Sequence, residues 1–194
     1  MSATPCPDIY SNFEYLGAAS GYTEDVYEAI GDAPLFDRFS KNEIAALCQF
    51  MHCFAAPRGG MVLTEGDEGD YALIILSGSV DVRKQSPEGE VVTIANVCCG
   101  SSLGEMSLID GERRFASCVA TEPTDFAVFT RADLNEMLLR HPRLANKFLI
   151  KLMQILVGRL RTTGNLLLSN YHSAMKEHSP KACETSVAQP SHGK

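Results

Sequence analysis

The stretch "LGEMSLIDGERRFAS", residues 103–117, decides the fold. The pair Gly104–Glu105 precedes a short apolar run, and Gly111 separates this run from Arg113–Arg114. Gly104 permits a tight turn or the close approach of a ligand. The run "EMSLID" predicts a short helix whose first amides lack partners and carry the positive end of the helix dipole. The order strand, glycine, short helix, arginine and strand therefore predicts an anion site.

The charged residues of this stretch suit different parts of one ligand. Arg114 follows the short helix after the chain has turned back, and a guanidinium beside bare amides suits a phosphate. Glu105 is a carboxylate near this positive site, so it must accept hydrogen bonds, and a sugar hydroxyl is a suitable donor. We interpret Arg113 as a surface charge. A ligand with both a phosphate and a ribose hydroxyl fits the arrangement.

Short β-branched runs on both sides of this stretch predict strands. They are "MVLT", "YALIIL", "SVDVRK", "VVTIA", "SCVAT" and "DFAVF". Glycines punctuate these runs, and short strands with closely spaced turn signals indicate a barrel or a sandwich. The run "YALIIL" alternates poorly, so we expect a central strand that is buried on both faces.

Helical patterns lie before and after the strands. We expect a short helix over 23–30, and "SKNE" from Ser40 is a capping box that opens a second one. After "RADLNEMLLRH", which predicts another short helix, Pro142 suits the start of a long helix over 142–170. Its apolar stripe exceeds what a small barrel can cover, and Gly158 and Gly164 interrupt it. We therefore expect a homodimer through this helix.

These patterns give one domain over residues 23–170. Residues 1–22 carry Pro, Ser, Gly and scattered aromatic residues, and we interpret them as an N-terminal arm. Residues 171–194 are polar and poor in aliphatic side chains, which predicts a disordered tail without a helix-turn-helix.

The composition excludes several functions. The net charge is −7 and the pI is about 5.2, which argues against a nucleic-acid or membrane partner. Neither a signal peptide nor an apolar span is found, so we expect a cytoplasmic protein. The number of cysteines is odd, and we interpret them, including the pair Cys98–Cys99, as small hydrophobic residues rather than metal ligands. No catalytic motif is found, so we expect no enzyme and no metal.

Taken together, these residues resemble the phosphate-binding cassette of cyclic-nucleotide-binding domains, the family of catabolite activator protein and the regulatory subunit of protein kinase A. The resemblance covers residues 35–170 and includes "EGDEGDYALIILSGSVDV", residues 65–82. It implies an α+β fold, a cyclic-nucleotide-binding jelly-roll β-barrel with flanking N-terminal helices and a long C-terminal helix. In activator-type members that helix forms the dimer.

The resemblance also implies roles for individual residues. Gly104 gives access to the backbone, Glu105 holds the ribose 2′-hydroxyl, and Arg114 holds the cyclic phosphate. Amides near Glu105, Met106 and Ala116 complete the phosphate cradle. The residues we expect to bind the ligand are Leu103, Gly104, Glu105, Met106, Arg114, Phe115, Ala116 and Thr163.

Two positions depart from the family pattern. Phe115 stands where a small residue is usual, and Thr163–Gly164 stands where activator-type members carry Thr–Ser. The expected function is a stand-alone sensor that binds cyclic AMP, with cyclic GMP less favoured, and signals to a protein partner through movement of the long helix. Two alternatives are a cyclic di-GMP-binding module and a ligand-free interaction scaffold whose pocket is filled by Phe115.

Overall fold

The fold was taken from a computed structural model, which describes residues 10–177. The chain divides into two compact units, residues 1–155 and 156–194. The first unit contains all strands of the described part and most of its helices. The strands are β1 Glu14–Ala18, β2 His52–Ala56, β3 Met61–Leu63, β4 Tyr71–Ile75, β5 Ser79–Gln85, β6 Val91–Cys98, β7 Ser102–Leu103, β8 Ser117–Ala120 and β9 Thr124–Thr130.

The strands form two antiparallel sheets. One has the order β1-β2-β9-β4-β7 and the other the order β3-β8-β5-β6. Strand β4, the run "YALII", pairs with β9 on one side and β7 on the other, and all its residues are buried. The expectation of a central strand buried on both faces is therefore confirmed.

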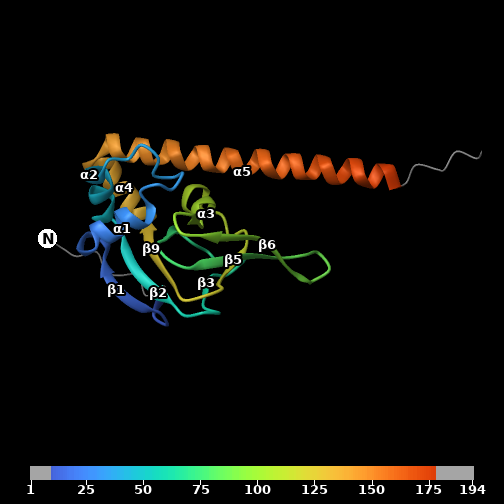
Figure 1. The fold of residues 1–194 in the computed structure, drawn as a ribbon, viewed down its shortest axis with the longest axis horizontal. Helices are drawn as coiled ribbons and strands as arrows, with labels where there is room; N and C mark the ends of the chain where they lie inside the picture. The colour runs from blue at the N-terminus through green and yellow to red at the C-terminus, as the bar shows by residue number, and fades with distance from the viewer. Residues whose placement is uncertain (1–9, 178–194) are drawn as a thin grey trace, which may run out of the picture. The chain divides into compact units, whose positions relative to one another are not determined.

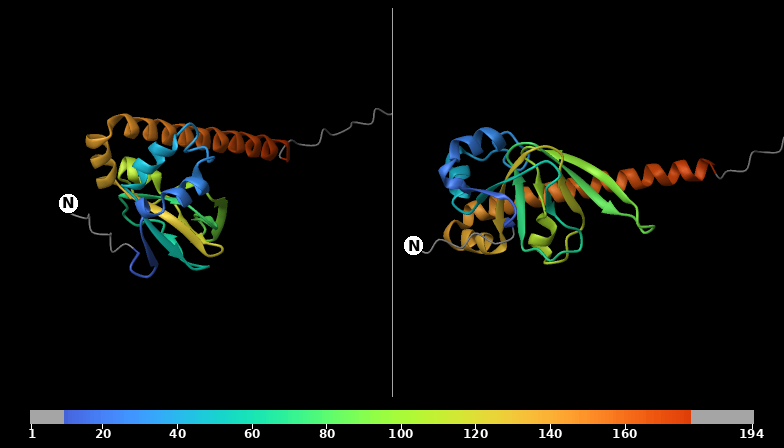
Figure 2. Two further views of the ribbon diagram at one scale, coloured as in Figure 1. Left: turned by 60° about the vertical axis from the view of Figure 1, so that its left-hand side comes forward. Right: turned by 90° about the horizontal axis from the view of Figure 1, so that it is seen from below.

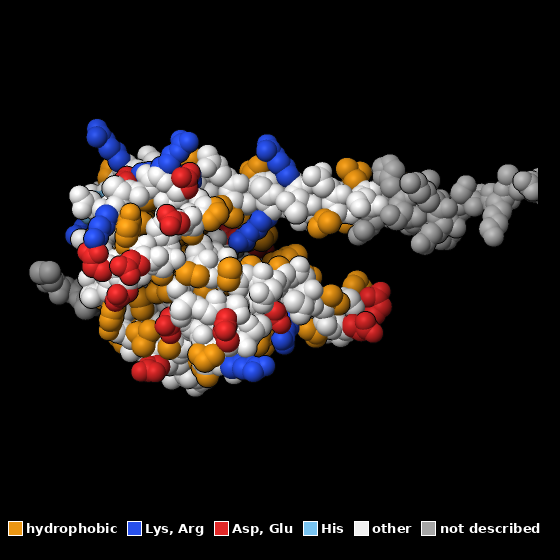
Figure 3. Space-filling view, in the orientation of Figure 1, with side chains coloured by type: hydrophobic (Ala, Val, Ile, Leu, Met, Phe, Trp, Pro, Cys, Tyr) orange, Lys and Arg blue, Asp and Glu red, His pale blue; other side chains and the backbone are white. Residues whose placement is uncertain are grey.

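The β5–β6 hairpin is the most exposed part of the sheets. In β6 every residue is exposed except Val97, which is half-buried. Figure 1 shows the hairpin extending away from helices α1, α2 and α4. Acidic side chains gather at its tip in Figure 3. The register shifts between Val82 and Arg83, so a β-bulge interrupts the hairpin.

Helices α1 and α2 lie between β1 and β2 in the chain, and two further helices follow β9 (Figure 2). Ser40 and Glu43 form the expected capping box, and Thr130 with Asp133 forms a second one. The first turns of the last helix are tied to the N-terminal region, because Lys147 binds Glu43. The helices are α1 Thr23–Ile30, α2 Lys41–Cys48, α3 Glu105–Asp110, α4 Arg131–Arg140 and α5 Pro142–Glu177, with a 3-10 turn η2 at Ala19–Gly21.

Two apolar clusters form the core. One joins the helices to a face of the first sheet and includes Ile30, Leu47, Ala127, Met137 and Phe148. The other fills the space bounded by strands of both sheets and includes Tyr10, Leu73, Val80, Leu103 and Phe126. The expected α+β class, a jelly-roll barrel with flanking N-terminal helices and a long C-terminal helix, is confirmed.

The expected ends of the elements need two corrections. The N-terminal arm expected over 1–22 contains β1, which pairs with β2, because the half-buried Leu16 packs against the helical core. The long helix expected to end at residue 170 continues to Glu177, so the first residues of the expected tail are helical. Residues 1–9 and 178–194 lie outside the described part, and the rest of the tail prediction falls there.

Candidate functional site

The stretch 103–117 folds as a turn, a short helix and a return. Strand β7 ends at Leu103, and Gly104 has φ 73°, which only glycine adopts without strain. Helix α3 follows from Glu105 to Asp110. The next residue, Gly111, caps the helix with φ 78°. The chain then runs through Arg114 into β8. This is the order of elements expected from the sequence.

Arg114 is the central side chain of the site. It is only 4% exposed. Its Nη1 donates to the carbonyl oxygens of Tyr71, at 2.8 Å, and Gly104, at 3.0 Å. Its Cζ lies 4.2 Å from the centroid of the Tyr71 ring, a cation–π contact. Its Nη2 is buried and has no hydrogen-bond partner among the residues described, so one strong donor remains available for an acceptor.

Two glycines make room for this guanidinium. A Cβ on Gly104 would lie 2.5 Å from Nη1 of Arg114, and a Cβ on Gly69 would overlap Nε, Cζ and Nη2. The backbone amide of Arg114 also donates to the carbonyl of Asp67, at 2.8 Å. The loop before β4 therefore shapes the site. Sequence reasoning missed the roles of Gly69 and Tyr71, although both lie in the glycine-rich stretch 65–82.

Glu105 is the buried carboxylate of the site. It is the first residue of α3 and only 2% exposed. It stands in the first turn of α3, the end of a helix at which acidic residues are favoured. The structure thus brings Gly104, Glu105 and Arg114 together, since the Gly104 carbonyl binds the arginine directly.

The other predicted residues divide into buried and exposed positions. Leu103 and Ala116 are buried, at 5% and 8% exposure, so their side chains serve packing. Met106 is 47% exposed. Thr163 is exposed on α5 in the second unit, and it stays a prediction.

Phe115 points away from the interior. Its side chain is 55% exposed, and Lys84 Nζ lies 4.6 Å from the centroid of its ring. The same Nζ donates to the Phe115 carbonyl at 2.7 Å and to Glu65 Oε1 at 2.6 Å. The hydrogen bond from Lys84 and, after it, that from the Gln85 amide lower the pKa of Glu65. The ring is thus held at the surface and does not fill the space around Arg114.

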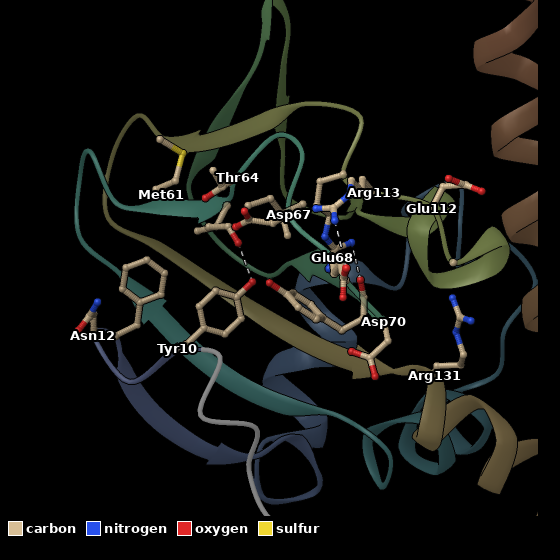
Figure 4. Close-up of a pocket in the computed structure, with 17 residues that line it drawn as sticks. Tyr10, Asn12, Met61, Thr64, Asp67, Glu68, Asp70, Glu112, Arg113 and Arg131 are labelled. Carbon is tan, nitrogen blue, oxygen red and sulfur yellow. Dashed lines mark hydrogen bonds and ion pairs between the residues drawn. The ribbon is translucent and has the colours of Figure 1, made fainter.

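A cavity of about 900 Å³ is lined in part by Arg114. Figure 4 shows Tyr10 and Asn12 at one end of it and Glu112 and Arg131 at the other. Burial raises the pKa of Tyr10 well above its ordinary value, and its hydroxyl donates to Val62 O. Of the predicted ligand-binding residues only Arg114 lines this cavity, and both acidic and basic side chains surround it. Its mixed charge gives it no clear ligand class.

Two observations concern metals and membranes. Within residues 10–177, no group of three His, Cys, Asp or Glu side chains is placed to hold a metal ion. No helix in that part of the chain is long and apolar enough to cross a bilayer.

Comparison with known proteins decides the family. The sequence profile of the cyclic nucleotide-binding domain matches residues 54–141. A solved cyclic nucleotide-binding domain from Methylobacillus flagellatus KT is 46% identical, with a TM-score of 0.75 over 84% of this chain and 91% of that one. The chain belongs to the cyclic nucleotide-binding domain family. The resemblance inferred from the cassette is therefore confirmed.

Several curated relatives of this cyclic nucleotide-binding domain are regulators. A CRP-like cAMP-activated global transcriptional regulator of Mycobacterium tuberculosis is 28% identical over 72% of this chain and 61% of its own length. A cAMP-dependent protein kinase regulatory subunit of Yarrowia lipolytica is 29% identical over 64% of this chain and 34% of its own length. The chain thus spans less than two thirds of either relative. The family supports a regulatory domain that binds cyclic nucleotides.

Proposed function

We propose that this chain is a sensor that binds cyclic AMP in the segment 103–117 and acts by binding rather than by catalysis. The observation that carries the proposal is Arg114, a buried guanidinium whose Nη2 lacks an acceptor among the described residues. A cyclic phosphate carries one negative charge and supplies that acceptor, with a small rotation of the arginine side chain. The names of the relatives, cAMP-activated and cAMP-dependent, support cyclic AMP as the ligand.

The remaining roles follow from the same geometry. Glu105, at the start of α3, accepts hydrogen bonds from the ribose 2′-hydroxyl, and Gly104 leaves the backbone accessible. The backbone amides of Glu105, Met106 and Ala116 complete the phosphate cradle, with Leu103 packed beneath it. Thr163 contacts the base. The proposal gives the chain no DNA-binding role, in keeping with its net charge of −7.

A titration with two matched arginine variants tests the ligand. Arg113 is adjacent to Arg114, but its side chain is 67% exposed and pairs with Glu68 at 3.2 Å. Because charge-assisted hydrogen bonds contribute about 1.5–3 kcal/mol each, Arg114→Ala should weaken cyclic AMP binding by about 100-fold. Arg113→Ala should change it by less than about three-fold.

Calorimetry of the wild type with cyclic AMP, cyclic GMP and cyclic di-GMP completes this test. Tightest binding of cyclic AMP is the expected result. Tightest binding of cyclic di-GMP would instead establish the dinucleotide alternative. The absence of heat with all three would overturn the sensor, and a thermal melt of each variant shows whether it is folded. The exposed ring of Phe115 counts against the scaffold alternative, which needs that ring to fill the pocket.

The proposal includes a homodimer through α5. Apolar or small residues recur along this helix at alternating spacings of four and three, the pattern of a coiled-coil seam. Those with side chains are between 45% and 72% exposed, and a Cβ on the glycine would meet no atom within 4 Å. The seam consists of Val157, Leu160, Gly164, Leu167 and Tyr171.

The dimer is the route by which the signal passes to a protein partner in this proposal. Cyclic AMP shifts the population between two positions of α5, which changes the surface offered to that partner. The free cysteines suit a cytoplasmic location, where thiols stay reduced.

Light scattering on two variants of α5 tests the dimer. Leu160→Asp places a charge on the seam and should give a monomer at micromolar concentration. Asn165→Asp adds the same charge off the seam and should remain a dimer. A monomeric wild type would contradict this part of the proposal without affecting the ligand.

A further inference from the structure

Phe115 and Lys84 form an exposed cation–aromatic pair directly beside the phosphate-binding arginine. Arg114 is turned inward to Tyr71 and Gly104, and Phe115, the next residue, is turned outward with 55% of its side chain exposed. An aromatic ring with this exposure contributes little to the core. The ring therefore lies at the surface, one residue along the chain from Arg114.

Lys84 fixes this ring from one face. Its Nζ lies 4.6 Å from the ring centroid, and the same Nζ binds the Phe115 carbonyl at 2.7 Å. Glu65 accepts from Lys84 through Oε1 and from the Gln85 amide, at 3.0 Å, through Oε2. The Glu65 amide donates in turn to Ser117 Oγ, at 2.9 Å. Three separate segments therefore set the orientation of the ring before a ligand arrives.

An open, partly apolar surface continues from this pair. On β5, Val80 is fully buried, Val82 is half-buried and Lys84 is next on the same face, so that face runs from the core to the hairpin. Lys84 pairs across the hairpin with Val92, which is 48% exposed. A hollow of about 540 Å³ begins here, within the size range of ligand pockets. Its lining is Glu65, Lys84, Gln85, Ser86, Pro87, Val92 and Ile94.

We propose that the Phe115 ring stacks on the purine base of the bound cyclic nucleotide, and that Lys84 is the residue that positions the ring. The lysine covers one face of the ring, which leaves the other for a base. Base–aromatic stacking is tolerant of sequence but favours large π surfaces, so the pair would select purine over pyrimidine cyclic nucleotides. This inference rests on the proposed function, since it assumes a nucleotide held by Arg114.

Binding by four variants tests the stacking. Phe115→Ala should weaken cyclic AMP binding by about ten-fold, and Phe115→Tyr should keep wild-type affinity. Affinity for cyclic UMP should change little, so the ratio of cyclic AMP to cyclic UMP affinity should fall in Phe115→Ala. Lys84→Met should lower the ratio of cyclic AMP to cyclic UMP affinity by about three-fold. Lys84→Arg keeps a cation over the ring, so this variant should have the wild-type ratio. A lysine with a merely structural role would weaken both ligands equally.

A fluorescent ligand reports the stacking directly. The cyclic phosphate of 2-aminopurine riboside should be quenched when bound to the wild type, and bright when bound to Phe115→Ala at saturating protein. Wild-type affinity or tighter binding in Phe115→Ala, or equal fluorescence in the two complexes, would overturn the inference while leaving the sensor intact. If the wild type binds no cyclic nucleotide, the proposed function fails and the inference fails with it.

Discussion

Strand β4 is buried along its whole length, whereas β6 is exposed at every residue except the half-buried Val97. The two strands have different roles in the domain, one in the core and one at the surface. Strand β4 begins with Tyr71, whose carbonyl and ring both hold Arg114, so the candidate site is anchored in the core. Strand β6 contributes little to the core and leaves apolar side chains open beside the site. The difference separates residues that hold the site from residues that remain available to a ligand.

The largest expected effect is on the free energy of unfolding, and it tests the difference between the buried strand β4 and the exposed strand β6. Leu73 of β4 is fully buried and pairs with Leu103 and Val128. Leu73→Ala should lower the free energy of unfolding by about 2–5 kcal/mol, because it leaves a cavity in the core. Val92→Ala, at a 48% exposed position of β6, should cost less than about 1 kcal/mol. Urea unfolding followed by circular dichroism measures both, and similar losses would break the comparison.

A smaller effect sharpens the comparison at the boundary between core and site. The added Cβ of Gly69→Ala would overlap Nε, Cζ and Nη2 at the end of the Arg114 side chain, so this side chain must move. Cyclic AMP affinity should fall by about ten-fold while the protein stays folded. The matched control is Gly21→Ala, where a Cβ meets nothing within 4 Å. Equal affinity in the two variants would show that the arginine tolerates displacement.

The smallest effect concerns a half-exposed ion pair. The hydrogen bond from Lys147 and, after it, the Ser40 amide lower the pKa of Glu43 below its ordinary value of 4.5. A carboxylate with a lowered folded pKa stabilises the protein above the unfolded value, and this contribution is lost as the pH falls through the folded pKa. Glu43→Gln keeps the capping box and should flatten the loss of stability below pH 4.5.

Thermal melts across this pH window measure the effect. Lys147→Gln should flatten the curve in the same way, since it removes the largest cause of the shift. If Lys147→Gln retains the full wild-type slope, the pair does not set the pH response.

The order of the helices and strands could be predicted from the sequence, but most contacts between distant residues could not. The capping box at Ser40, the strand runs and the glycines around α3 all act through neighbours in the chain, so their patterns are local. The fixing of Arg114 is not local, because its acceptor Tyr71 lies 43 residues away in the sequence. The contact of Lys84 with Phe115 also depends on sheet register, because Arg83 of β5 pairs with Ser117 of β8.

Strand β1 was not predicted from the sequence, and the physical reason is a different one. Its sequence "EYLGA" lacks β-branched residues, and Gly17 interrupts its register with β2. Its pairing is supplied by its partner and by the burial of Leu16, not by its own propensity. Tertiary context of this kind is invisible in a single local pattern.

The bulge in the β5–β6 hairpin has a consequence for solubility. Within the described residues β6 is the outer strand of its sheet, and it carries exposed Val91, Val92 and Ile94. A flat, apolar outer strand is a template on which strands of other molecules add and fibres grow. The extra residue of the bulge twists the strand and breaks its row of backbone donors and acceptors, and the acidic tip repels like chains. The irregularity therefore lowers the tendency of the exposed hairpin to pair with other copies of the chain.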